Sequence, residues 1–114
     1  MKRVLICGGR DYDDNDTLCA ALDRLHAEHS FTVVIAGGAR GADTLAAQWA
    51  EHRGIPTKVY MAEWEKLGRK AGPIRNQRML DEGKPDLVIA FRGGTGTAGM
   101  MALAGKAGVP VISI

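Results

Sequence analysis

Five short runs of consecutive apolar residues constrain the fold of this chain more than any other feature. They occupy residues 4–7, 32–36, 57–60, 87–91 and 109–114 of 114. Most of their residues are β-branched, and the runs are nearly continuous instead of alternating with polar residues. Continuous runs are typical of strands whose two faces are both covered, as in a parallel sheet. We therefore predict five parallel strands.

Helical patterns fill the four gaps between these runs. Asp14, Asn15 or Asp16 is a suitable cap for a first helix with leucines on one face, and further helices are predicted over 42–53, 73–82 and 97–106. Gly54 is placed to end the second helix, and Pro73 to begin the third. Strictly alternating strands and helices predict an α/β, Rossmann-like, doubly wound sheet of five parallel strands with helices on both faces. The strand order that we expect is 3-2-1-4-5, in one domain spanning residues 1–114.

Charge and composition exclude several classes of protein. The formal net charge is only +2, which argues against an extended nucleic-acid surface. No apolar run is long enough to span a bilayer, and residues 1–7 resemble a strand more than a signal peptide. Cys7 and Cys19 lack the spacing of metal ligands and are expected to be reduced thiols. We predict a cytoplasmic protein without a membrane partner.

Histidine gives no sign of a metal centre. His26, His29 and His52 are expected on exposed helix faces, without acidic or cysteine partners at ligand spacing. We therefore predict no metal site built from histidine. Trp49 lies inside a helical pattern and is expected to pack in the core.

Glycine-rich segments follow three of the predicted strands. Glycine lets backbone amides approach an anion closely, and the helix that follows adds free N–H groups and the positive end of its dipole. Because the carboxyl ends of parallel strands lie at one sheet edge, we expect amides from all three loops to converge on one anion. The candidate ligand-binding residues in these loops are Gly8, Gly9, Arg10, Gly37, Gly38, Arg40, Gly41, Gly93, Gly94, Thr95, Gly96 and Thr97.

Two further segments carry candidate ligand-binding residues. Trp64 follows the third strand and is predicted either to stack on a base or to pack in the core. Arg75 and Asn76 lie in the first turn of the third predicted helix, where a cation is unfavourable unless an anion or carboxylate accompanies it. Both residues are therefore assigned to the ligand site.

Three carboxylates near these loops are candidates for activating water: Asp11, Asp43 and Glu63. The alternatives are structural. Asp11 also suits a solvated turn or an ion pair with Arg10, and Asp43 suits the positive end of a helix dipole. A carboxylate near bound phosphate needs an arginine, a sugar hydroxyl or a metal ion as partner. Whether Mg²⁺ is a cofactor is therefore left open by the sequence. Thr95 and Thr97 suit a helix cap as well as a phosphate.

The loops do not match the best-known nucleotide-binding fingerprints. Neither a G-x-G-x-x-G segment with a following acidic residue nor a G-x-x-x-x-G-K-[ST] segment is present. A conventional dinucleotide-binding domain and a P-loop ATPase are therefore not predicted.

The motifs taken together resemble the SLOG superfamily, and within it the small YspA or cpYpsA-related branch. The segments that carry the resemblance are GGRDY at 8–12, GGARGAD at 37–43, AEW at 62–64, GP-x-RN-x-x-M at 72–79 and GGTGT at 93–97. The resemblance covers nearly the whole chain. It implies a Rossmann-like fold and a site for nucleotides or their derivatives. Relatives include LOG phosphoribohydrolases, DprA single-strand-DNA binders and sensor domains.

One position departs from the LOG pattern. LOG enzymes carry P-G-G-x-G-T-x-x-E, whereas this chain has Arg92 in place of the proline and Met100 in place of the catalytic glutamate. Methionine is neither an acid nor a base. Two hypotheses therefore stay open: an enzyme that hydrolyses an N-glycosidic or phosphate-linked bond, and a sensor that only binds its ligand. A DprA-like single-stranded-DNA binder is the weaker third hypothesis, and a homo-oligomer, dimeric or higher, is expected.

Overall fold

The computed structural model describes all residues 1–114 and contains a five-stranded, all-parallel sheet in the order β3-β2-β1-β4-β5. The strands are β1 (Lys2–Cys7), β2 (Phe31–Ala36), β3 (Thr57–Val59), β4 (Leu87–Ala90) and β5 (Val111–Ser113). The helices are α1 (Asn15–His29), α2 (Ala42–His52), α3 (Trp64–Leu67), α4 (Ala71–Gly83) and α5 (Thr95–Lys106), with a 3₁₀ turn η1 (Gly68–Lys70). The predicted fold class and strand order are confirmed.

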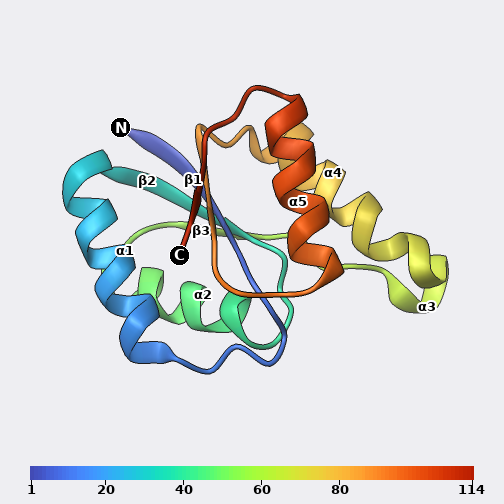
Figure 1. Cartoon of the computed structure of the whole chain (residues 1–114), viewed down its shortest axis with the longest axis horizontal. Coiled ribbons are helices and arrows are strands. Elements are labelled where there is room, and N and C mark those ends of the chain that lie inside the picture. The colour runs from blue at the N-terminus through green and yellow to red at the C-terminus, as the bar shows by residue number, and fades with distance from the viewer.

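Two helices cover each face of the sheet (Figure 1). On one face, α1 and α2 pack against alternate strand residues such as Val4, Ile6 and Ile89. On the other face, α4 and α5 cover the intervening residues, including Leu5, Ile35 and Val88. The three central strands are almost fully buried, which is why their sequences are continuously apolar.

The ends of α1 and α2 follow the sequence signals. Asp14 caps α1 by accepting a hydrogen bond from the Thr17 amide at 3.1 Å. Gly54, just after α2, adopts a φ of +68°, which L side chains rarely adopt. The predicted inward face of α1 is buried, as is Trp49 in α2.

Several boundaries differ from the predictions. The helix α4 begins at Ala71, so Pro73 lies within its first turn, where its missing N–H has no intrahelical partner to lose. The helix α5 begins at Thr95 and not at residue 97. The strand β3 is an exposed edge strand and not a strand covered on both faces. The segment α3–η1 was not predicted, because it buries none of its residues and therefore shows no apolar periodicity.

Two histidines differ from their predicted exposure: His26 and His29 are both half-buried, and only His52 is exposed. The His26 Nδ1 accepts the Phe31 amide at 3.0 Å, and its ring contacts the rings of Phe31 and Trp49. His26 is therefore a half-buried structural residue. None of the helices combines the length and the apolar character needed to cross a membrane.

Candidate functional site

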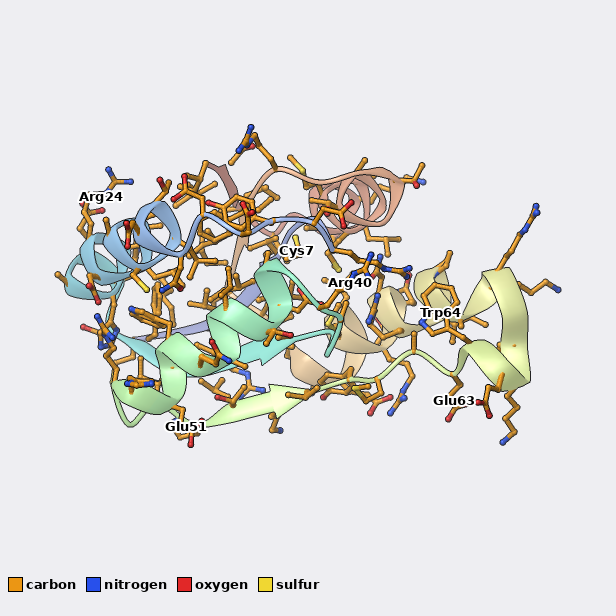
Figure 2. The ribbon with its side chains drawn as sticks, turned by 90° about the horizontal axis from the view of Figure 1, so that it is seen from below. Cys7, Arg24, Arg40, Glu51, Glu63 and Trp64 are labelled. Atoms are coloured by element: carbon orange, nitrogen blue, oxygen red, sulfur yellow. The ribbon has the colours of Figure 1, made fainter.

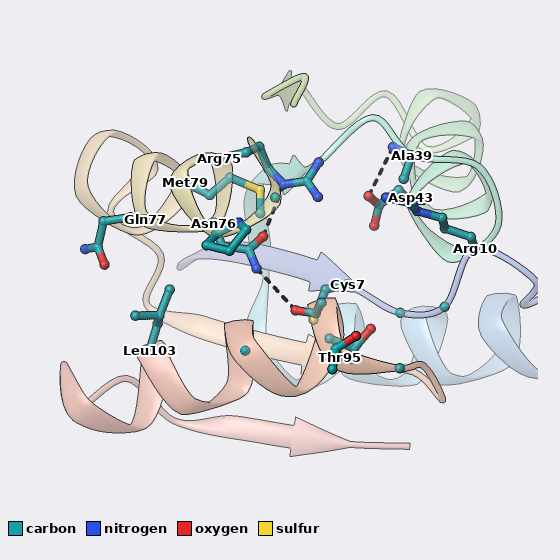
Figure 3. Close-up of a pocket in the computed structure, with 18 of the residues that line it drawn as sticks. Cys7, Arg10, Ala39, Asp43, Arg75, Asn76, Gln77, Met79, Thr95 and Leu103 are labelled. Carbon is teal, nitrogen blue, oxygen red and sulfur yellow. Dashed lines mark hydrogen bonds between the residues drawn. The ribbon is translucent and has the colours of Figure 1, made fainter. Parts of the chain in front are cut away.

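A cavity of about 820 Å³ opens at the carboxyl ends of the central strands, beside the switch point between β1 and β4. Ligands of open parallel sheets bind at this place, because the loops there diverge to opposite faces. The cavity is bounded by the loops after β1 and β2, by α3 and η1, and by the facing sides of α4 and α5 (Figure 3). Of the predicted ligand residues, those that line it are Gly8, Gly9, Arg10, Trp64, Arg75, Asn76, Gly94, Thr95, Gly96 and Thr97.

The first and third glycine-rich loops are adjacent, as expected, but some of their amides donate hydrogen bonds to carbonyls of the protein. The Gly9 amide donates to the Arg92 carbonyl at 2.8 Å, and the Ala42 amide donates to the Gly9 carbonyl at 3.1 Å. A Cβ on Gly9 would lie 2.9 Å from the Arg92 carbonyl oxygen. Close packing of one loop against another is therefore sufficient reason for glycine at this position.

The second loop is organised around Asp43. Its carboxylate accepts the Ala39 amide at 3.2 Å, and the Gly37 amide also stabilises its charge. The Ala39, Gly37 and Gly9 amides are therefore engaged within the protein, and convergence of the remaining loop amides on one anion stays a prediction. The predicted ligand residues that do not line the cavity are Gly37, Gly38, Arg40, Gly41 and Gly93, and their contact with a ligand stays a prediction.

Free amides remain at the beginning of α5. Its N-cap is Gly94, no side chain caps it, and Gly94, Thr95, Gly96 and Thr97 all line the cavity. The first N–H groups of an α-helix have no partner within the helix, and the helix dipole favours negative charge beside them. Thr95 and Thr97 lie inside the helix and not at its cap, so the structural alternative for them is wrong.

Three arginines line the cavity together with a single acidic residue. They are Arg10, Arg69 and Arg75, and the acidic residue is Asp43. Burial lowers the pKa of Arg75, the charge of Asp43 opposes this, and the positive charge of Arg10 adds to the lowering. Two guanidinium groups are therefore close enough to repel each other. The lining carries more positive than negative charge.

Asn76 connects Arg75 to the beginning of α5 (Figure 3). Its side-chain oxygen accepts from the Arg75 Nε at 3.1 Å, and its side-chain nitrogen donates to the Gly96 carbonyl at 3.2 Å. A second Arg75 nitrogen donates to the Gly37 carbonyl. Asn76 is only 6% exposed. It therefore positions Arg75, and its small exposed part belongs to the cavity wall.

Of the three candidate carboxylates, only Asp43 reaches the cavity. Burial raises its pKa, an effect that the Ala39 amide and the Arg75 charge partly oppose. Asp11 is an exposed residue whose carboxylate lies 3.3 Å from the exposed Arg40 guanidinium, so Asp11 pairs with Arg40 and not with Arg10. Glu63 is exposed, and its side chain and that of Trp64 point in different directions (Figure 2).

Trp64 lies at the cavity wall and not in the core. Its side chain is 45% exposed, and the Arg10 Cζ lies 4.9 Å from the ring centroid. Gly72 supports the ring from α4, because a Cβ there would approach the indole to 3.1 Å. The cavity that contains the beginning of α5 is therefore also lined by an indole that lies under a guanidinium.

Sequence reasoning missed other residues of the cavity wall. The Gly72–Pro73 motif was recognised, but its position in the wall was not. The remaining lining residues are Cys7, Ala39, Arg69, Gln77, Met79, Gly99 and Leu103. Arg69 belongs to the basic segment before α4, which was the one available signal. Arg78, from the same motif, pairs with Glu82 outside the cavity. No cluster of three or more His, Cys, Asp or Glu side chains is arranged to hold a metal ion.

The burial of Cys7 in the cavity wall predicts a slow reaction of its thiol. The thiol is 7% exposed, and burial, with a contribution from the charge of Asp43, raises its pKa from 9.0 to about 12. Because the thiolate is the reactive form, we expect Cys7 in the folded protein to react with Ellman's reagent at pH 8 about a thousandfold more slowly than a free thiol. Cys19, which is half-buried, serves as the internal reference. Equal rates for the two thiols would contradict this assignment.

Comparison with known proteins agrees with the resemblance noted in the sequence. A family profile described as YspA, cpYpsA-related SLOG family matches residues 2–67. The Gene 61 protein of Mycobacterium phage D29 is 43% identical over 121 residues, which covers 99% of this chain and 96% of that protein.

A solved structure shares the fold. DNA processing protein A (DprA) from Streptococcus pneumoniae superimposes with a TM-score of 0.77 over 96% of this chain, at 18% sequence identity. This chain spans about half of that protein, 49% of its length. The length of the profile match and the identity to the phage protein establish the relationship at the level of sequence. The chain belongs to the YspA, cpYpsA-related SLOG family.

Proposed function

We propose that the cavity binds a nucleotide or nucleotide-derived ligand. The observation that carries the proposal is the excess of positive charge in the lining, where three arginines face one buried carboxylate. A phosphate group would neutralise this excess, with the free amides of α5 and the guanidinium of Arg75 as donors. The indole of Trp64 would then face the base. Membership of a SLOG family supports this choice of ligand.

The proposed site differs from the one expected from the glycine motifs alone. The donors are the beginning of α5 and the arginine side chains, while the glycines after β1 and β2 hold the loops together. Binding would therefore depend on side-chain charge more than on a cradle of glycine amides. Substitution of one of the three cavity arginines should weaken binding more for a ligand with more negative charges than for a ligand with fewer.

Hydrolysis of the ligand is a second candidate function, and Asp43 is the observation that favours it. It is the single carboxylate of the cavity, and burial raises its pKa, as is common for a general base. Met100 is 1% exposed in the core beneath α5, so the position of the LOG glutamate offers no group to the cavity. A sensor without chemistry would use the same site and release no product.

A ligand panel tests the proposal. Purified protein is screened by thermal denaturation against the four nucleoside 5′-monophosphates, NAD and ADP-ribose, each with and without Mg²⁺. A ligand at 100 times its Kd is expected to stabilise the fold by about 2.7 kcal/mol, and so to raise Tm by several degrees. No shift with any member of the panel would refute nucleotide binding.

Analysis of the same mixtures by chromatography separates the enzyme from the sensor. An enzyme would release a base, a sugar phosphate or inorganic phosphate, and Asp43→Asn would stop release while a thermal shift remained. Bound but intact ligand would favour the sensor. A shift in the mobility of single-stranded oligonucleotides at low salt would instead favour the DprA-like alternative. Native mass spectrometry would count the subunits, because self-association stays a prediction.

A further inference from the structure

The guanidinium of Arg10 covers the indole of Trp64, which is the surface proposed to receive a base. The Arg10 Cζ lies 4.9 Å from the ring centroid, within the range of a cation–π contact. Trp64 is 45% exposed, and Gly72 of α4 lies next to the ring. A base that stacks on the same face of the ring must therefore compete with Arg10.

Arg10 has no carboxylate that holds it in this position. The ion pairs of the chain do not include it, and the nearby Asp43 is engaged with the Ala39 amide. The second arginine of the cavity, Arg75, is held by the Gly37 carbonyl and by Asn76. Arg75 is therefore fixed by hydrogen bonds, whereas Arg10 has only the contact with the indole and the more distant charge of Asp43. A phosphate beside Arg75 and the beginning of α5 is a stronger partner for Arg10 than an aromatic ring.

We propose that Arg10 is a specificity-determining residue that makes the cavity select phosphorylated nucleosides over nucleosides without phosphate. This inference rests on the proposed nucleotide site. A phosphorylated ligand draws Arg10 away from Trp64 and so frees the ring for its own base. A nucleoside must displace Arg10 and offers no anion in return.

The two kinds of ligand should respond in opposite directions to the loss of Arg10. In Arg10→Ala, the affinity for a nucleoside 5′-monophosphate should fall about 10- to 100-fold, because a charged hydrogen bond is lost. The affinity for the corresponding nucleoside should rise about two- to fivefold, because the cation–π contact that competed with it is gone. A residue that only contributed to binding would lower both affinities or leave the nucleoside unaffected.

The experiment measures both affinities by calorimetry, with the four nucleosides and their 5′-monophosphates as probes. Arg24→Ala is the matched control, because it removes one exposed positive charge from α1 at the other end of the molecule from Trp64 (Figure 2). Arg24→Ala should change neither affinity. Arg10→Lys, which keeps a cation able to reach both the ring and a phosphate, should retain most of the preference for the monophosphate.

Acrylamide quenching gives a second readout that needs no ligand. Trp49 is only 2% exposed, so quenching of tryptophan fluorescence reports mainly on Trp64. Arg10→Ala should increase quenching, and a nucleoside should then reverse the increase. If monophosphates bind to the wild type but nucleosides bind no better to Arg10→Ala, the inference is wrong and the proposed function stands. If the wild type binds no monophosphate at all, the proposed function fails, and the inference fails with it.

Discussion

The Gly41→Ala variant is expected to lose about 3–5 kcal/mol of unfolding free energy, a large part of the roughly 5–15 kcal/mol that is typical of a domain. Gly41 has a φ of +80°, and a Cβ there would lie 2.3 Å from the Gly9 carbonyl oxygen and 2.5 Å from that of Arg10. Both opposing atoms belong to the backbone, so neither moves cheaply. The substitution would push the loop before α2 away from the loop after β1.

Gly54→Ala is the matched control for this prediction. Gly54 also has a positive φ, +68°, but a Cβ there would meet nothing within 4 Å. Its cost should therefore be conformational strain alone, about 1 kcal/mol. Urea denaturation of both variants measures the difference. Equal losses would show that strain, and not contact between the loops, makes glycine necessary at position 41.

The Arg75→Ala variant is expected to lose about 2–4 kcal/mol of stability together with its affinity for anions. The substitution removes the donor to the Gly37 carbonyl and the partner of the Asn76 oxygen. It also removes the half-buried cation that most stabilises the charge of Asp43, a carboxylate that is only 6% exposed. An uncompensated buried charge destabilises a fold more than the loss of a pair of charges does.

A double-mutant cycle separates these effects. Asp43→Asn keeps an oxygen for the Ala39 amide and removes the charge, so the double variant should lose less stability than the sum of the two single variants. Arg78→Ala, on the same helix, is the control, because Arg78 pairs with Glu82 on an exposed face. Its denaturation midpoint should change little. Strict additivity of Arg75→Ala and Asp43→Asn would show that the two charges do not interact.

The parts of the fold predicted from sequence were those with a strong, local physical signal. Continuous apolar runs such as residues 4–7 and 87–91 indicated buried parallel strands, and those strands are buried. Asp14 and Gly54 marked helix ends because capping and positive φ depend on the residue itself. The segment α3–η1 gave no such signal, since it buries no residue. Its place beside the cavity depends on contacts with α4.

The candidate site was predicted in part for the same reason. Parallel strands bring their carboxyl ends together, so the sequence already indicated that the residues after β1 and β4 and those opening α4 meet at one edge. Which carboxylate enters the cavity was not predictable: Asp43 and Asp11 have similar sequence contexts, yet Asp43 is buried and Asp11 is exposed with Arg40. The difference in burial between Asp43 and Asp11 depends on how the loops pack against one another, which short segments of sequence do not reveal.

Apolar periodicity, turn residues and motif spacing are properties of short segments, so they were sufficient to predict the α/β class, the strand order and the family. Which polar groups remain free for a ligand depends instead on contacts across the fold. The amides of Gly9 and Ala39 are taken by the Arg92 carbonyl and by Asp43, while those that begin α5 have no partner in the helix. A hydrogen-bond donor is free for a ligand only when no acceptor of the protein pairs with it. The possible acceptors come from segments far apart in the chain, so they cannot be identified from a local stretch of sequence.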